Sequence, residues 1–140
     1  MIQPYEKILN EFAAELGNMG FARENESSHG ACFRRTDGLS FLVSLERPAN
    51  GFSVELQPTG VKIGDGYSAG LLMEALAPDR FRRIKESLAN QSDPEFLRLW
   101  WREFCGFLRD EGGKLNPLPA SLKAQYDAIC AAKMRAFGLE

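Results

Sequence analysis

The chain has 140 residues, of which 44% are hydrophobic, and this length and composition predict a single domain, residues 1–140, with a buried core. Its 17 basic and 19 acidic residues give a formal charge of −2, so no general attraction to nucleic acid or to an anionic membrane is expected. The sequence contains no run of about 20 apolar residues, and its first residues do not resemble a signal peptide, which predicts a cytoplasmic protein.

Three cysteines, Cys32, Cys105 and Cys130, lie far apart in the chain. An odd number of widely spaced cysteines is typical of buried free thiols rather than of a disulfide framework or a metal site. No motif for a metal or a cofactor is present, so neither is expected.

Residues 4–16 predict an amphipathic helix. Its apolar residues recur at helical spacing: Tyr5, Ile8, Leu9, Phe12 and Leu16. Gly17 or Gly20 is expected to end this helix. The polar segment 21–30 then predicts a loop or an irregular first strand, and it contains the only histidine, His29.

Between residues 31 and 57 the apolar residues alternate, which predicts half-buried antiparallel strands. Because strand partners share a face, the same pattern selects the turn lengths. A three-residue loop at 36–38, with Gly38 in a left-handed conformation, and a four-residue loop at 47–50 are therefore predicted. The resulting register pairs Phe33 with Phe41, Ala31 with Val43, and Leu45 with Phe52.

The opposite face of this predicted sheet is polar on balance. It carries Arg34, Ser40, Leu42, Ser44, Glu46, Ser53, Glu55 and Gln57. Such a face is either ordinary solvent-exposed surface or a binding platform, and Leu42 is the residue that favours binding. Val61 and Ile63 predict a fourth strand.

Residues 66–70, Gly-Tyr-Ser-Ala-Gly, match the G-x-S-x-G turn that carries the catalytic serine of α/β-hydrolases. In that family an acid and then a histidine follow the serine, but no histidine follows Ser68 in this chain. Gly64 and Gly66 also match part of a dinucleotide-binding loop, although the third glycine is misplaced. We therefore expect a turn from sheet to helix with Ser68 as the helix N-cap, and keep a small serine hydrolase as an alternative.

Two short helices are predicted next, at 68–76 and 79–89, separated by Pro78. The second helix has an apolar stripe, and its outer face contains the one basic cluster of the chain: Arg80, Arg82, Arg83 and Lys85. Acidic residues lie beside this cluster. It is expected to be a solvated helix face or a docking patch for an acidic protein surface.

Residues 92–110 give the strongest helical pattern. Half of the helix circumference is apolar: Phe96, Leu97, Trp100, Trp101, Phe104, Cys105, Phe107 and Leu108. Burying each large side chain contributes roughly 1.5–3 kcal/mol, so this half must be covered. The apolar arc is wider than one neighbour needs, and a small-ligand pocket between the sheet and Trp100/Trp101 is therefore an alternative. Leu99 or one tryptophan is a candidate exposed anchor for a partner.

The last predicted helix spans 121–137, with Leu122, Tyr126, Ile129, Cys130 and Phe137 on one side and Lys133 inside that stripe. The whole pattern predicts an α+β fold. In this fold an N-terminal helix precedes an antiparallel meander of three to four strands, and four helices then pack on one sheet face.

The element order, the helix end at 16–21, the Phe33-Arg34-Arg35 segment and the strand at 39–45 resemble small bacterial domains of unknown function of the toxin-immunity type. This resemblance covers roughly the first 60 residues. It implies a protein that binds another protein, and it transfers no site residue because such families share no site motif.

The first functional hypothesis is a non-enzymatic protein-binding module, in particular a cytoplasmic immunity protein that blocks the active site of a toxin. Its candidate partner-binding residues are Arg80, Arg82, Arg83, Glu46, Glu55 and Leu42. The alternatives are the hydrolase that uses Ser68 and the small-ligand binder. No nucleic acid, membrane or cofactor is expected as a partner, and the sequence leaves the oligomeric state open.

Overall fold

The computed structural model describes residues 5–27, 30–46, 51–61, 65–87 and 94–138. Its elements, in chain order, are α1 (Tyr5–Glu11), α2 (Ala13–Asn18), β1 (Phe21–Ser27), β2 (Gly30–Arg35), β3 (Ser40–Glu46), β4 (Gly51–Gln57), β5 (Tyr67–Ser68), α3 (Ala69–Leu76), α4 (Pro78–Lys85), α5 (Pro94–Glu111), the 3-10 turn η1 (Gly112–Lys114) and α6 (Ala120–Ala136). The fold class is α+β, as the sequence predicts.

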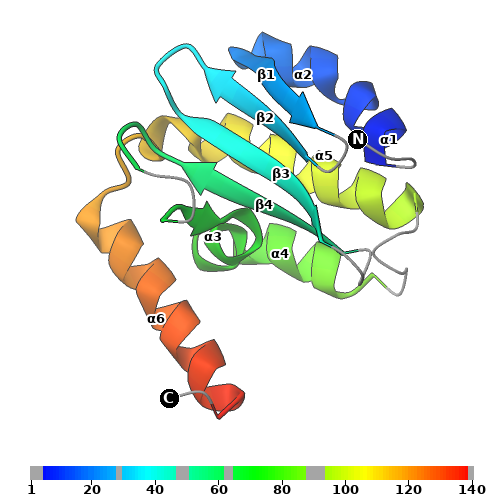
Figure 1. Ribbon diagram of the computed structural model, residues 1–140. Coiled ribbons are helices and arrows are strands. Elements are labelled where there is room, and N and C mark those ends of the chain that lie inside the picture. The colour runs from blue at the N-terminus through cyan, green and yellow to red at the C-terminus, as the bar shows by residue number, and fades with distance from the viewer. Residues whose placement is uncertain (1–4, 28–29, 47–50, 62–64, 88–93, 139–140) are drawn as a thin grey trace.

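The strands form one antiparallel sheet in the order β1-β2-β3-β4-β5, so strands that follow each other in the chain are neighbours. Figure 1 shows α5 behind this sheet, with α1 to one side of it and α4 below β4. Among the described helices, none lies in front of β2, β3 and β4 in that view. The sheet therefore has one covered face and one open face.

The N-terminal helix is divided in two, where the sequence predicts one. The break is at Phe12, whose N–H donates to the carbonyl of Leu9 at 3.1 Å, a three-residue step that interrupts the α-helical ladder. Of the predicted inward residues, Tyr5, Ile8, Leu9 and Leu16 are buried, and Phe12 at the break is half-buried. Gly20 follows with a φ of 91°, the left-handed conformation that glycine adopts without strain.

The predicted strand register is confirmed. Phe33 pairs with Phe41, Ala31 with Val43, and Leu45 with Phe52. The turn at 36–38 has Gly38 at a φ of 99°, and the N–H of Arg35 donates to the carbonyl of Leu39 at 2.7 Å. The loop at 47–50 lies outside the described residues.

The sheet has two strands that were not firmly predicted. β1 forms where the sequence allowed either a loop or a strand, although His29 lies outside the described residues. The fourth strand predicted from Val61 and Ile63 is wrong at Val61, which is not in a strand, and Ile63 lies outside the described residues. The strand that follows β4 is instead the two-residue β5.

Two residues expected on the wet face are buried. Ser40 is 2% exposed and Gln57 is 7% exposed. Both side chains have polar partners beside them: Ser40 Oγ donates to Gln57 Oε1 at 3.5 Å, and Gln57 Nε2 donates to Glu55 Oε2 at 2.6 Å. These two hydrogen bonds satisfy the polar groups of Ser40 and Gln57, so both side chains can be buried at this end of the sheet.

Helix α5 provides the centre of the core. Every residue of its predicted apolar stripe is buried, and Phe41 of the sheet packs against Trp101 at 6.1 Å and Phe104 at 5.3 Å between ring centroids. The expected capping residues Ser92 and Asp93 lie outside the described residues. Glu103, which the helical wheel places on the polar side, is only 6% exposed because α4 covers it.

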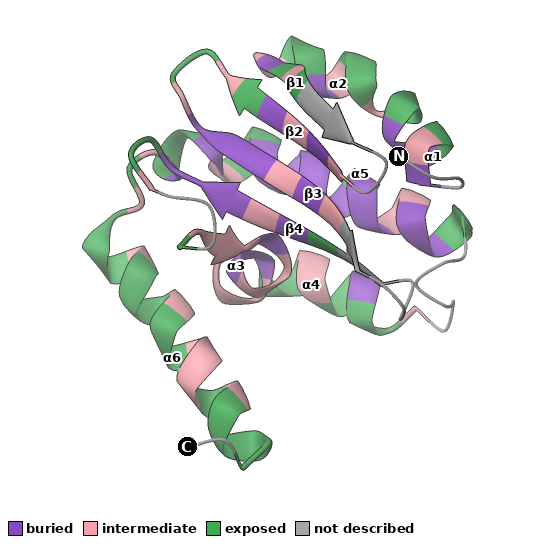
Figure 2. Cartoon of the chain, viewed as in Figure 1, coloured by how far each residue is buried: buried purple, intermediate pink, exposed green. Residues whose placement is uncertain are grey.

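Helix α6 does not pack on the sheet face, which corrects the prediction of four helices there. It lies beside α3 at the edge of the sheet (Figure 1) and has no buried residue. Figure 2 shows α6 almost entirely exposed or half-buried, in contrast to α5. Phe137, expected on its inner side, is 78% exposed.

Candidate functional site

A groove of about 500 Å³ lies where β4, the start of α3, α4, the start of α5 and α6 meet. We call it the β4 groove. Its apolar wall is formed by Val54, Phe81, Ile84, Phe96 and Trp100. Its polar lining includes Ser53, Ser68, Lys85, Ser87 and Lys133. The groove lies at the edge of the sheet and uses Trp100 but not Trp101, so it differs from the predicted pocket beneath the tryptophan helix.

The hydrophobic core reaches the surface in this groove. Ile84, Phe96 and Trp100 are each 8% exposed, more than any other residue of the described core. All three line the β4 groove, whereas Trp101 and Phe104 behind them are 3% and 0% exposed. Apolar side chains that meet solvent in a concave site are the usual lining of a binding pocket.

Two lysines stand at this groove, and they differ in their partners. Lys133 of α6 is ion-paired with Glu74 at 3.1 Å, and its Nζ lies 6.0 Å from the centroid of the Phe81 ring. Lys85 is exposed at the end of α4 and has no ion-pair partner among the described residues. The positive charge of Lys85 is therefore available to an incoming acidic group.

The groove borders β4 at Ser53 and Val54, beside the start of α3. The hydrogen bond from Arg35 to Leu39 fixes which residues of β3 point their backbone groups toward β2. Because alternate residues of a strand direct their N–H and C=O groups to opposite sides, Val54 points these groups away from β3. The pairing of β4 with β5 covers Glu55 and Leu56, and the start of α3 at Ala69 then packs against β4.

Ser68, the serine of the G-x-S-x-G match, is the N-cap of α3, as predicted. Its Oγ accepts a hydrogen bond from the N–H of Leu71 at 3.3 Å. Its own N–H donates to Tyr126 Oη at 2.9 Å, which ties α6 to the sheet edge. The sheet is antiparallel, unlike the parallel sheet in which a hydrolase places this turn.

The basic cluster of α4 is largely paired within the molecule. Arg80 donates to Glu103 Oε1 at 3.1 Å and to Asp110 Oδ2 at 2.6 Å, and Arg83 Nη2 lies 2.8 Å from the same oxygen of Glu103. Arg82, the most exposed of the three, is 3.2 Å from Asp79. The hydrogen bond from Arg83, with that from Arg80, holds the pKa of Glu103 below its usual value although burial opposes this shift.

The other three predicted contact residues belong to the open face of the sheet. Leu42 and Glu55 are cross-strand partners, and both are half-buried. The backbone of Glu46 pairs with Gly51, while its side chain lies outside what the structure describes. Helix α4 instead packs against α5, which lies behind the sheet (Figure 1), so the six predicted residues do not form one surface.

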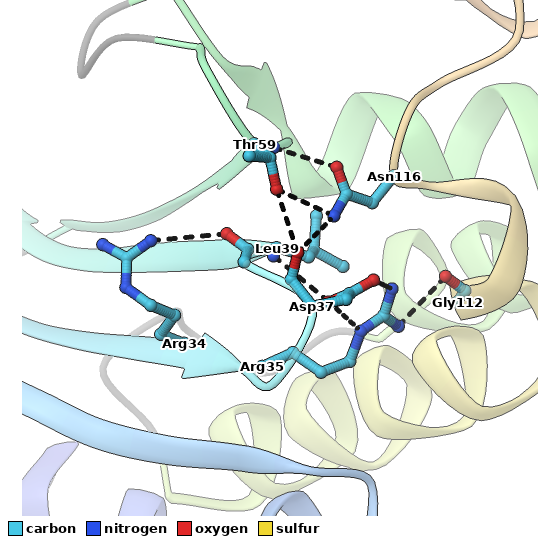
Figure 3. A network of polar contacts seen from close by, with 8 residues as sticks. Arg34, Arg35, Asp37, Leu39, Thr59, Gly112 and Asn116 are labelled. Carbon is cyan, nitrogen blue, oxygen red and sulfur yellow. Dashed lines mark hydrogen bonds and ion pairs between the residues drawn. The ribbon is translucent and has the colours of Figure 1, made fainter.

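A polar network joins the β2–β3 turn to the segment after α5 (Figure 3), and sequence reasoning missed it. Arg35 donates to both carboxylate oxygens of Asp37, at 2.8 and 2.7 Å, and to the carbonyl of Gly112 at 3.0 Å. Asn116 Nδ2 donates to the carbonyl of Asp37 at 3.2 Å and to Thr59 Oγ1 at 3.0 Å. The Arg35 hydrogen bonds hold the pKa of Asp37 well below its usual value. This network holds the β2–β3 turn against the segments at Thr59 and at residues 112–116. None of its residues lines the β4 groove.

Few other reactive or metal-binding side chains are found among the residues that the structure describes. Cys32, Cys105 and Cys130 are free thiols, and burial raises the pKa of Cys105 to about 12. Only Cys105 is fully buried, whereas the sequence predicted burial for all three. No group of three or more metal-ligating side chains is found among the described residues. Of the helices described, none has the length and apolar content needed to cross a membrane.

Comparison with known proteins identifies no relative. No family model matches the chain, and neither a curated protein nor a solved structure matches it. The site must therefore be interpreted from its own geometry, in which the β4 groove combines a wall of core side chains with the exposed cation of Lys85.

Proposed function

We propose that this chain is a non-catalytic protein-binding module, in particular a cytoplasmic immunity protein that neutralises a bacterial toxin by covering its active site. The observation that carries the proposal is the β4 groove, where the core opens to solvent. Binding energy at protein interfaces is concentrated in a few residues at well-packed pockets, often involving tryptophan. Trp100 and Phe96 at this groove have the character of such residues.

Exposed positive charge on α4 also supports a binding role. Arg82 and Lys85 lie on the exposed side of α4, beside the groove, where a complementary acidic partner would associate faster. By contrast, Arg80 and Arg83 are held by Glu103 and serve to fasten α4 to α5. The partner-binding role proposed for the basic cluster is therefore limited to Arg82 and Lys85, which Glu103 does not hold.

The proposal is tested with a toxin domain encoded beside the gene for this chain. Co-expression should restore growth of a host that produces the toxin, and the purified chain should form a stable complex with the toxin and inhibit its activity. A toxin from an unrelated system serves as the control and should be unaffected. Full toxin activity in the presence of excess chain, with no complex on size-exclusion chromatography, would contradict the proposal.

A small-ligand function is the second candidate, because the groove volume of about 500 Å³ falls within the usual range for such sites. A ligand that binds only the folded state stabilises the protein by an amount that grows with the logarithm of ligand concentration above the dissociation constant, so the melting temperature of the protein rises. A panel of apolar monocarboxylic acids, matched to the apolar wall and Lys85, should then raise the melting temperature of this chain. The hydrolase alternative predicts labelling by a fluorophosphonate probe that Ser68→Ala abolishes.

A further inference from the structure

We propose that the chain forms a twofold-symmetric homodimer in which Phe137, at the end of α6, inserts into the β4 groove of the second copy. This inference goes beyond the proposed function, because it states what covers the groove when no other partner is bound. It accounts for two features that the single chain leaves exposed to solvent: an aromatic side chain on α6 and an apolar hollow near it.

Phe137 is the anchor of this dimer. It is 78% exposed, and Met134, one turn earlier, is 49% exposed; the described residues contain no other exposed large hydrophobic side chain. Figure 1 shows the end of α6, in red, clear of α3 and α4, so neither of these helices covers Phe137. Aromatic residues bury about 150–250 Å² each when they are covered, and they are typical anchors of protein interfaces.

The β4 groove offers a matching receptor on the side that borders α6. Phe81 of α4 is half-buried there, and Ile84 and Trp100 belong to the same apolar wall. The groove volume of about 500 Å³ is ample for one aromatic ring. The exposed cation of Lys85 would also attract the face of an incoming ring, as Lys133 Nζ, 6.0 Å from the centroid of Phe81, already does within the chain.

The place of the anchor relative to the groove determines the symmetry of the assembly. Lys133 lines the groove, and Phe137 follows it by four residues, so both lie on the same side of α6, about 6 Å apart along the helix axis. When an anchor and its receptor belong to one surface, two copies can exchange both contacts across a single twofold axis. A receptor on the opposite side of the molecule would produce an open filament instead. A closed dimer is therefore expected.

The test measures self-association of the full chain by sedimentation velocity over a range of protein concentrations. Phe137→Ser removes the anchor and leaves the groove intact. Gly70→Leu fills the groove and leaves the anchor intact, because Gly70 lines the groove and a Cβ there meets only Ser68 Oγ within 4 Å, at 3.8 Å. The matched controls are Gln125→Ser, at an exposed position on another side of α6, and Gly17→Leu, in α2 with open space around it.

The two variants should complement each other. Either substitution removes both insertions from its own homodimer, so each variant should associate at least about a hundredfold more weakly than the unmodified chain, at about tenfold for each insertion lost. An equimolar mixture restores one insertion, from the Gly70→Leu copy into the intact groove of the Phe137→Ser copy. The mixture should therefore associate at least about tenfold more tightly than either variant alone, and the two controls should change dimerisation by less than about twofold.

A second measurement does not depend on whether Gly70→Leu folds. Trp100 lines the groove and is 8% exposed, so an inserted ring should exclude solvent from it. The tryptophan emission of the unmodified chain should shift to shorter wavelength as the protein concentration rises, and that of Phe137→Ser should not. At concentrations low enough for the monomer, Phe137→Ser should keep the melting temperature of the unmodified chain, because the side chain is exposed there.

Three results would overturn the inference: a chain that stays monomeric at every concentration, a dimer that Phe137→Ser or Gly70→Leu leaves unchanged, or a mixture of folded variants that associates no better than its components. The proposed function is tested separately, because Phe137→Ser keeps the groove open and should still form the toxin complex. Toxin neutralisation without dimerisation would overturn only this inference. A dimer with the expected behaviour and no effect on the toxin would contradict only the proposed function.

Discussion

Helices α5 and α6 are nearly the same length, 18 and 17 residues, but they differ in how far they are buried. Both show apolar residues at helical spacing, and both were expected to pack on the sheet. In the structure α5 buries ten residues and α6 buries none. Both stripes contain large side chains, but that of α5 has eight apolar residues, whereas that of α6 has five and is interrupted by Lys133. Helical spacing therefore predicts the helix, and the number of large apolar residues on one face distinguishes the buried helix from the exposed one.

The two helices are also held by different interactions. The aromatic residues of α5 form a continuous set of ring contacts, from Trp100 and Trp101 to Phe104 and Phe107. Helix α6 is attached mainly through Tyr126, which contacts Ser68 and Tyr67, and through the ion pair between Lys133 and Glu74. A helix held by polar contacts at one side can be altered without loss of the core.

The largest expected difference comes from removing one phenylalanine from each helix. Phe104→Ala should lower the free energy of unfolding by about 3–5 kcal/mol, because Phe104 is fully buried against Phe41 and both tryptophans. Phe137→Ala should change it by less than about 0.5 kcal/mol, because its side chain is 78% exposed. Urea unfolding followed by tryptophan fluorescence measures both. Equal losses would show that α6 is covered in solution.

The second largest difference in the free energy of unfolding is expected when one acidic residue of each helix is replaced by its amide. Glu103→Gln should lower the free energy of unfolding by about 2 kcal/mol, because it weakens two charged hydrogen bonds and leaves Arg80 and Arg83 without their shared carboxylate. Asp127→Asn is the matched change in α6, where Asp127 is 3.3 Å from Lys123 in an exposed pair. That variant should lose less than about 0.5 kcal/mol. A Glu103→Gln protein as stable as the unmodified chain would contradict the role of Glu103 in joining α4 to α5.

The pH dependence of the free energy of unfolding should also differ between these two variants. The folded-state pKa of Glu103 is lowered by Arg83 and Arg80, so its stabilising contribution is present above the ordinary glutamate value of about 4.3 and is lost as the pH falls through the folded value. Unfolding measured from pH 6 to pH 3 should therefore show a shallower loss of stability in Glu103→Gln than in the unmodified chain. Asp127→Asn should leave this slope unchanged.

The smallest effect is expected at the attachment of α6. Tyr126→Phe removes the oxygen that accepts the Ser68 N–H at 2.9 Å, which should cost about 1 kcal/mol. The loss should be local, with faster amide exchange in α6 and at the start of α3 and unchanged exchange in α5. Hydrogen exchange followed by mass spectrometry makes this distinction. Faster exchange throughout α5 would show instead that α6 stabilises the whole core.

The strands and the central helix were predictable because their patterns are local. The alternation along 39–57 specifies which residues face inward, and a register that matches these faces follows without knowledge of the tertiary fold. The apolar stripe of α5 was identified for the same reason. Val61 was assigned wrongly because a short apolar alternation occurs in connecting segments as well as in strands.

The candidate site depended on contacts between residues far apart in the sequence. The sequence by itself determined the α+β class, the inward faces and the N-cap at Ser68, because each depends on neighbours within a few residues. Only the tertiary structure decided that β5 stops after two residues, that Glu103 meets Arg80 and that the core opens beside Val54. These features arise where separate elements meet, and residue spacing along one element carries no information about what packs against it.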